Sequence, residues 1–200
     1  MEKLDVYDEY MNKIGTESRG VVHERGLWHK TVHCWMYDDN GNVFFQERAD
    51  SRKLYTTASG HVSAGETVRD AFTREIMEEI GVDTDTSNAI AIQIVFWRQD
   101  KDEKNWHDRA FAHVYINKLP IGFTDFHISS DEVSAVVRIN AEKCIDLLMG
   151  KIPEITATRI TSNGVNSVSI NKSDFLTAPN ETAIVKYGHI LQSIMQITGK

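Results

Sequence analysis

Three carboxylates on one short segment constrain this chain more than any other feature of its sequence. Residues 66–80 repeat an apolar side chain at every fourth position, which predicts a helix, and Gly81 follows where a left-handed cap is favoured. The last two turns of this helix contain Glu75, Glu78 and Glu79. At 100° per residue these side chains fall within about 100° of the helix circumference, next to the apolar stripe. The fold must therefore accommodate like charges at the border of a buried face.

Two interpretations account for this acidic stripe. Like charges at these spacings repel by about 0.2–0.5 kcal/mol per pair, and the negative end of the helix dipole adds roughly 0.3–1 kcal/mol for each charge. On one interpretation the face is solvated and Arg74 pairs with Glu78 four residues later. On the other, the carboxylates hold a hard cation, Mg²⁺ or Mn²⁺, that bridges to substrate phosphates. Gly60 and Gly65 precede the helix and let the backbone approach a ligand closely, which favours the cation.

Composition narrows the class of protein. The chain has 200 residues, 41% of them hydrophobic, which is enough for one sizeable core, and we predict a single domain over residues 1–200. A net charge of −7 argues against duplex nucleic acid and anionic membranes as partners and favours a small-molecule substrate. We expect neither a membrane span nor a secretory signal. Two cysteines, Cys34 and Cys144, cannot build a disulfide framework, so we expect a cytoplasmic protein.

The rest of the chain alternates strand and helix patterns. The hairpin signal Asn40-Gly41 joins two strand-like segments, and residues 99–105 form a charged loop between two others. Residues 1–18 are expected to form a short helix or an ordered arm. The predicted strands are residues 20–24, 31–37, 43–48, 89–98, 106–117, 134–139 and 165–170, and the further predicted helices are residues 141–149 and 182–197. This order predicts an α/β or α+β core in which helices cover a mixed sheet.

A longer motif contains the three carboxylates. Gly60 is followed after five residues by Glu66, and then after seven by Arg74-Glu75-Ile76-Met77-Glu78-Glu79-Ile80-Gly81-Val82. This stretch resembles the Nudix box at every fixed position, and the chain is identified as a member of the Nudix superfamily. The resemblance implies an α/β/α sandwich with a mixed β-sheet, in which the box forms a loop, a helix and a loop. It covers residues 19–150 as the Nudix core and leaves residues 151–200 as a C-terminal extension without an assigned role.

The resemblance also implies roles for residues of the box. Glu75, Glu78 and Glu79 would bind Mg²⁺ or Mn²⁺, with the carbonyl of Gly60 as a further ligand. Glu66 and Arg74 would form a structural ion pair that holds the loop on the helix. The sequence Ser63-x-x-Glu66 also fits a capping box, so two roles remain open for Glu66.

The activity implied is hydrolysis of a diphosphate bond in a nucleoside diphosphate-type or other organic diphosphate. Divalent ions neutralise phosphate oxygens and activate water, so such a site needs carboxylates more than a protein nucleophile. Glu75 is our first candidate for the general base, because it can both bind the cation and accept a proton. Glu132 and Glu103 are alternatives, each of which is otherwise a surface acid.

Side chains that could recognise the substrate are less clearly marked. Candidates to bind phosphates are Arg48, Arg52 and Lys53, which follow the hairpin. Candidates to stack on a base or ring are Trp28, Trp97 and Trp106. Core packing or a surface position is the alternative for each. The last helix either caps the core or contributes to a homodimer.

The segments before the box resemble the branch related to isopentenyl diphosphate isomerases. The matching segments are residues 19–23, 26–30, 46–48 and 60–61. His23, His29 and His61 stand near the positions of that branch's histidine ligands, although a hydrogen-bonded structural histidine is the alternative. Those isomerases place a catalytic cysteine just before the box, where this chain has Thr-Thr-Ala-Ser-Gly at residues 56–60. An isomerase-like enzyme and a catalytically silent ligand-binding domain are therefore kept as alternatives to the hydrolase.

Overall fold

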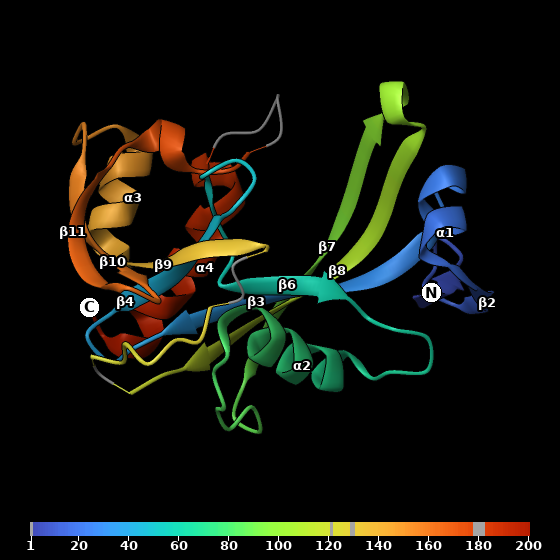
Figure 1. Ribbon diagram of the computed structural model, residues 1–200, viewed down its shortest axis with the longest axis horizontal. Coiled ribbons are helices and arrows are strands. Elements are labelled where there is room, and N and C mark those ends of the chain that lie inside the picture. The colour runs from blue at the N-terminus through green and yellow to red at the C-terminus, as the bar shows by residue number, and fades with distance from the viewer. Residues whose placement is uncertain (1, 121, 129–130, 178–182) are drawn as a thin grey trace.

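The computed structural model describes residues 2–120, 122–128, 131–177 and 183–200 (Figure 1). The strands are β1 (Lys3–Tyr7), β2 (Lys13–Ser18), β3 (Trp28–Tyr37), β4 (Asn42–Arg48), β5 (Leu54–Tyr55), β6 (Ala58–His61), β7 (Ile90–Lys101), β8 (Trp106–Lys118), β9 (Val133–Asn140), β10 (Ile155–Thr161) and β11 (Gly164–Ile170). The helices are α1 (Arg19–Arg25), α2 (Val68–Ile80), α3 (Ala141–Met149) and α4 (Ala183–Thr198), with short 3-10 turns η1 (Asp102–Lys104) and η2 (Lys172–Asp174).

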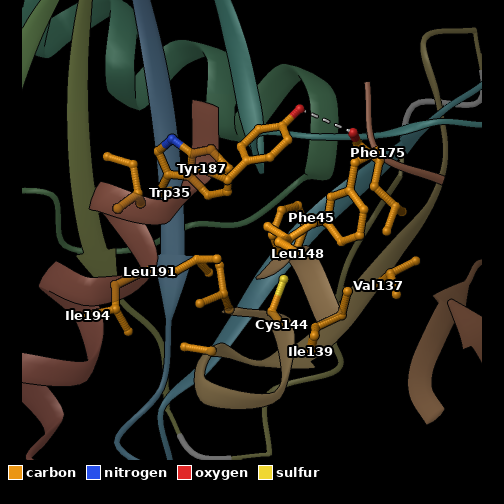
Figure 2. Close-up of a cluster of buried hydrophobic side chains, with 14 of the residues drawn as sticks. Trp35, Phe45, Val137, Ile139, Cys144, Leu148, Phe175, Tyr187, Leu191 and Ile194 are labelled. Carbon is orange, nitrogen blue, oxygen red and sulfur yellow. Dashed lines mark hydrogen bonds between the residues drawn. The ribbon is translucent and has the colours of Figure 1, made fainter. Parts of the chain in front are cut away.

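Strand β3 is the centre of a mixed sheet. It pairs antiparallel with β4 and β6 and parallel with β8, and β8 in turn pairs with β7. Alternate side chains of β3 enter two different cores. Cys34 and Met36 pack on the side covered by α2, whereas Trp35 and Tyr37 pack on the side covered by α3 and α4 (Figures 1 and 2). The predicted α/β sandwich with a mixed sheet is thus confirmed.

Residues 151–200 share both the sheet and the core. Strand β10 pairs with β9 and carries β11 as the next strand. The buried face of α4 includes Tyr187, Leu191 and Ile194, which lie in the same cluster as Trp35 and Phe45 (Figure 2). The apolar face of α4 is therefore covered within the chain, and the homodimer stays a prediction. Among the described residues, no helix is both long and apolar enough to cross a membrane.

The N-terminal region differs from the sequence-based expectation. Residues 20–24, predicted as a strand, lie in α1, which ends at Gly26 in the left-handed conformation. The strand prediction came from adjacent β-branched residues, but Val22 is buried against Leu4 and Val6, and this packing outweighs local propensity. Residues 3–18 form the hairpin β1–β2, so of the two expected alternatives the structure shows an ordered arm and not a short helix.

The connections follow the prediction more closely. Asn40-Gly41 forms the turn between β3 and β4, where Asp38 accepts hydrogen bonds from the backbone N–H groups of Asn40 and Asn42. Helix α2 begins two residues later than predicted, because Thr67 is its N-cap and accepts from the N–H of Asp70. The predicted loop 99–105 is shorter than expected, since β7 continues to Lys101 and only η1 and Asn105 separate it from β8.

Candidate active site

Helix α2 and strand β6 bring the predicted carboxylates against the backbone of Gly60. Strand β6 is held on β3, with Gly60 opposite Val32. At the other end of the helix, Gly81 has φ of 63° and its N–H donates to the carbonyl of Met77. A Cβ at Gly81 would overlap His127, so only glycine fits both the conformation and the contact. The pairing of β6 with β3 and the contact of Gly81 with His127 therefore set the position of α2 and of its glutamates relative to β6.

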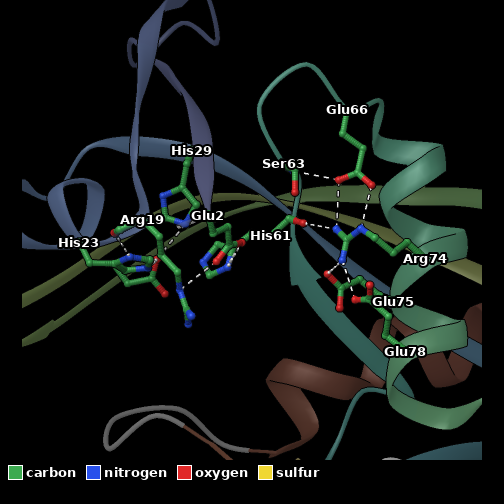
Figure 3. Close-up of polar contacts among 11 residues, drawn as sticks. Glu2, Arg19, His23, His29, His61, Ser63, Glu66, Arg74, Glu75 and Glu78 are labelled. Atoms are coloured by element: carbon green, nitrogen blue, oxygen red, sulfur yellow. Dashed lines mark hydrogen bonds and ion pairs between the residues drawn. The ribbon is translucent and has the colours of Figure 1, made fainter.

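The guanidinium of Arg74 organises the acidic stripe (Figure 3). Its Nε and Nη2 donate to the two carboxylate oxygens of Glu66 at 2.9 and 3.0 Å, and Nη2 also donates to the carbonyl of His61 at 2.8 Å. Its Nη1 donates to Glu75 at 2.6 Å and to Glu78 at 2.9 Å. Hydrogen bonds from Arg74 lower the pKa of Glu66. One arginine therefore ties the loop to the helix and orients two of the three glutamates.

Glu66 forms the predicted ion pair and also contacts Ser63, but the Ser63 contact does not cap a helix. Besides its ion pair with Arg74, it accepts a hydrogen bond of 2.8 Å from the backbone N–H of Ser63. The Ser63 contact lies in the loop, because α2 begins only after Thr67. Glu66 thus closes the loop before the helix and anchors it to Arg74.

Burial makes the charged forms of Glu79 and Glu75 electrostatically costly. Glu79 is 6% exposed and accepts hydrogen bonds from the N–H of Ser59 at 2.9 Å and from the side chain of Gln46 at 3.1 Å. Burial raises the pKa of Glu79 to about 8, and the Ser59 N–H opposes the rise while Glu75 and Glu132 add to it. Burial also raises the pKa of Glu75, against the attraction of Arg74. A nearby cation would therefore stabilise the ionised form of both carboxylates, which burial alone destabilises.

Gly60 is needed for the position of Glu75. A Cβ at residue 60 would overlap the carboxylate of Glu75, so only a glycine lets this carboxylate lie against the β6 backbone. Gly60 and the three glutamates of α2 line the same cleft, which encloses about 670 Å³. Its other lining side chains include three basic and several further acidic residues, namely Arg19, Arg48, Arg74, Glu2, Asp50, Asp131 and Glu132.

The structure separates the remaining predicted residues into two groups. Arg48 and Glu132 line the cleft with the glutamates. Arg52 instead pairs with Glu47 at 2.9 Å, and Lys53 donates to the backbone carbonyl of Ser173, so neither lines it. Glu103 lies exposed on η1 at the tip of the β7–β8 hairpin, far from α2 (Figure 1).

A second polar cluster lies on the other side of β6 (Figure 3). His23 from α1, His29 from β3 and His61 from β6 each offer a ring nitrogen, and these three atoms lie within 4.8 Å of one another. Asp108 on β8 approaches it, with its Oδ1 3.6 Å from Nε2 of His29, and Nδ1 of His61 lies 3.4 Å from Glu2. Neither Asp108 nor Glu2 was predicted from the sequence as a site residue.

Burial keeps these imidazoles neutral. It lowers the pKa of all three histidines, that of His61 to about 3. Nε2 of His29 and Oδ1 of Asp108 are buried and have no hydrogen-bond partner among the described residues. Neutral imidazoles and an unsatisfied carboxylate oxygen are the donor set of a transition-metal site.

Comparisons with known proteins agree with this geometry. A profile of the NUDIX domain matches residues 27–152. An uncharacterized Nudix hydrolase of Clostridium acetobutylicum is 32% identical over 97% of each chain. The protein belongs to the Nudix family. At lower identity, an isopentenyl-diphosphate delta-isomerase of Photorhabdus laumondii is 28% identical over 77% of this chain and 85% of its own. A crystal structure from Deinococcus radiodurans shares the fold, with a TM-score of 0.55 and 20% identity over 72% of this chain and 86% of its own.

The carboxylate side of this Nudix protein fits a hard divalent cation. Carboxylate and carbonyl oxygens are the ligands that Mg²⁺ and Mn²⁺ prefer, and two of the three carboxylates carry raised pKa values that a cation would reverse. The residues that would hold the cation are Glu75, Glu78, Glu79 and the carbonyl of Gly60.

The cysteines of this Nudix protein lie away from the cleft. Cys34 is buried beneath α2 with its Sγ 3.8 Å from the carbonyl of Phe72, and burial raises its pKa well above the usual value. Cys144 lies on the buried face of α3, where burial likewise raises its pKa. Before the box, the hydroxyls of Thr56 and Thr57 are bonded to backbone carbonyls of Cys34 and Phe44. Among the described residues, the lining of the cleft contains no thiol.

Proposed function

We propose that this protein is a divalent-cation-dependent hydrolase that cleaves a diphosphate bond in an organic diphosphate, of the nucleoside diphosphate type or another. The observation that carries the proposal is the cleft itself. It combines Glu75, Glu78 and Glu79 with the cationic side chain of Arg48 in one open space large enough for a phosphorylated small molecule. The membership of the Nudix family supports the same class of reaction.

In the proposed reaction a bound cation would activate water, and neighbouring side chains would position the carboxylates that hold the cation. Bound Mg²⁺ or Mn²⁺ would neutralise phosphate oxygens and lower the pKa of a coordinated water. Arg74 holds one oxygen each of Glu75 and Glu78, and Ser59 and Gln46 hold Glu79, so the three carboxylates are positioned before any ligand arrives.

The general base is proposed among residues of the cleft. Glu75 is our first candidate, because burial raises its pKa and favours proton acceptance. Glu132 lines the same cleft and is the second. The exposed position of Glu103 at the hairpin tip gives it no support. Arg48 is the candidate to contact a phosphate because it lines the cleft, where its guanidinium pairs with Asp50, whereas Arg52 and Lys53 do not line it.

The histidine cluster favours one alternative, an isomerase of prenyl diphosphates. The closeness of His23, His29 and His61 and the isomerase relatives support it. The buried cysteines argue against it, since neither supplies a thiol to the cleft. A catalytically silent domain is disfavoured because all three box glutamates are present.

A product assay tests the proposal. Phosphate and monophosphate release would be measured across nucleotide sugars, dinucleoside polyphosphates and isopentenyl diphosphate, with Mg²⁺ and with chelator, and the last compound would also be followed for a shifted double bond. We expect metal-dependent cleavage of at least one diphosphate. Glu78→Gln, on a side chain 58% exposed, should lose that activity and keep its unfolding temperature. Glu142→Gln, exposed on α3, is the matched control and should keep both.

Either of two results would overturn the hydrolase proposal. One is a folded, Mg²⁺-binding protein that cleaves nothing in the panel but shifts the double bond. The other is full cleavage by the Glu78→Gln variant.

A further inference from the structure

Gln46 is a fully buried polar side chain next to the carboxylates of the cleft. It lies on β4, opposite Tyr55 of β5 and Val136 of β9, and its exposed fraction is 0%. Its amide Nε2 donates to Oε2 of Glu79 at 3.1 Å, whereas its Oε1 is buried and has no hydrogen-bond partner among the described residues. A buried amide with an unsatisfied oxygen is costly, and an apolar side chain would avoid that cost. The one hydrogen bond that Gln46 donates therefore needs an explanation.

Glu79 accepts two hydrogen bonds at one of its two carboxylate oxygens. The backbone N–H of Ser59 donates to Oε2 at 2.9 Å, and Nε2 of Gln46 donates to the same atom. A carboxylate oxygen offers about two lone-pair positions, so these two donors occupy both positions of Oε2. Among the described residues, Oε1 of Glu79 accepts no hydrogen bond. Glu79 can therefore offer a cation its Oε1 but not its Oε2.

The other two glutamates of the cleft are not restricted in this way. Nη1 of Arg74 donates to Oε1 of Glu75 and to Oε2 of Glu78, which gives each of these oxygens one hydrogen bond. An oxygen that accepts one hydrogen bond keeps a lone pair for a cation. Among the three carboxylates, the restriction to one oxygen thus applies to Glu79. Gln46 is the side chain that completes it, because the other donor is a backbone N–H.

A carboxylate restricted to one oxygen discriminates between cations. Ca²⁺ takes about 6–8 oxygen ligands and often binds both oxygens of a carboxylate, whereas Mg²⁺ requires near-ideal octahedral coordination. We propose that Gln46 is a positioning residue that sets the cation selectivity of the cleft, because it fills Oε2 of Glu79 and so prevents bidentate binding of Ca²⁺. The proposal rests on the proposed function and deepens it, since it names a side chain that selects Mg²⁺ or Mn²⁺ over Ca²⁺.

Cation binding tests the role of Gln46 without any substrate. Titration calorimetry on the full chain would give the dissociation constants of Mn²⁺ and Ca²⁺, in a His61→Asn parent so that binding to the imidazole cluster is weakened. The parent should bind Mn²⁺ more tightly than Ca²⁺. Gln46→Met removes the donor but keeps an unbranched side chain, and it should weaken Mn²⁺ but not Ca²⁺. We expect the ratio of the Ca²⁺ constant to the Mn²⁺ constant to fall about tenfold, a usual effect of losing an outer-shell partner.

Two further variants separate cation selectivity from folding. Gln46→Asn keeps an amide on β4, but its side chain is one methylene shorter and falls short of Glu79, so it should lower the ratio as Gln46→Met does. Gln93→Met is the matched control, at a half-buried glutamine of β7 outside the cleft whose amide oxygen lies 3.0 Å from Nδ1 of His189. It should leave both constants unchanged. Thermal unfolding in chelator would identify the variants that are folded.

Three outcomes would overturn the role of Gln46. One is an unchanged ratio in a folded Gln46 variant, because a purely structural role would weaken both cations alike. The others are a parent that does not prefer Mn²⁺ to Ca²⁺ and unfolding of both Gln46 variants. The hydrolase proposal fails separately. A lowered ratio without cleavage of any diphosphate would retain the role of Gln46 and remove the reaction, whereas cleavage with an unchanged ratio would do the reverse.

Discussion

The carboxylate cluster and the histidine cluster flank the same strand, β6, yet they are built in opposite ways (Figure 3). The three glutamates come from two turns of one helix, and Arg74 of that helix holds two of them. The three histidines come from α1, β3 and β6, and the arginine beside them, Arg19, pairs with Glu2 at 3.6 Å (Figure 3). The first arrangement follows from spacing in the sequence, and the second exists only once three elements have packed.

Burial shifts the pKa values of the two clusters in opposite directions, and in both it favours the uncharged form of the side chains. It raises the pKa of Glu75 and Glu79 and lowers the pKa of His23, His29 and His61, so it favours the uncharged form in each case. A bound cation would stabilise either cluster, by neutralising the carboxylates or by accepting the nitrogen lone pairs of the neutral imidazoles. Oxygen ligands favour Mg²⁺ or Mn²⁺, whereas imidazole favours transition metals such as Zn²⁺, so the two clusters should differ in the ion they prefer.

The largest expected effect separates the clusters by activity. Glu79→Gln should lower Mg²⁺-dependent hydrolysis about a hundredfold or more, because loss of even an outer-shell partner of a metal costs about 10–100-fold. The unfolding midpoint in chelator should not fall, since the change removes a buried carboxylate whose pKa is raised. Steady-state kinetics and thermal unfolding would measure the two effects.

His61→Asn is the matched test on the other side of β6. It should leave Mg²⁺-dependent hydrolysis little changed, because the His61 backbone carbonyl still accepts from Arg74. We expect Zn²⁺ to raise the unfolding midpoint of the native protein, and His61→Asn should reduce that rise. A loss of Mg²⁺-dependent hydrolysis as large as that of Glu79→Gln would show that the clusters act as one site.

A smaller effect is expected at the backbone between the clusters. Gly60→Ala adds a Cβ that overlaps the Glu75 carboxylate, so Glu75 must move, and we expect kcat/KM to fall about 10–100-fold. Gly20→Ala in α1 is the matched control, since a Cβ there meets no atom within 4 Å. Equal activity of the two variants would mean that the position of Glu75 is unimportant for the reaction.

The smallest effect is expected at the buried thiol. Cys34→Ala should leave hydrolysis unchanged, because the pKa of this buried thiol is raised well above the usual value and it lines no part of the cleft. The change should lower the free energy of unfolding by about 1 kcal/mol, because Cys34 packs beneath α2. Denaturant unfolding and the same kinetic assay would check this. Loss of activity without loss of structure would return the cysteine-dependent isomerase to consideration.

Sequence reasoning succeeded where the relevant neighbours are close along the chain. The three glutamates belong to one helix, the Glu66–Arg74 pair joins that helix to the loop directly before it, and Asn40-Gly41 is the turn of one hairpin. It failed for residues 20–24, where local β propensity was outweighed by packing of Val22 on β1. It also grouped Arg48 with Arg52, although only Arg48 lines the cleft.

The sequence by itself determined the family and the helix that carries the three carboxylates. Helical periodicity makes residues three and four apart neighbours in any fold, so their shared face follows from spacing alone. Tertiary structure decided what surrounds that helix. The register of β3 on β8, with His29 opposite Ala110, brings Asp108 to the histidines, and the packing of α4 on the core brings Lys186 to Tyr55 and Trp97. Such contacts join residues separated by about eighty or more positions, and no local pattern encodes them.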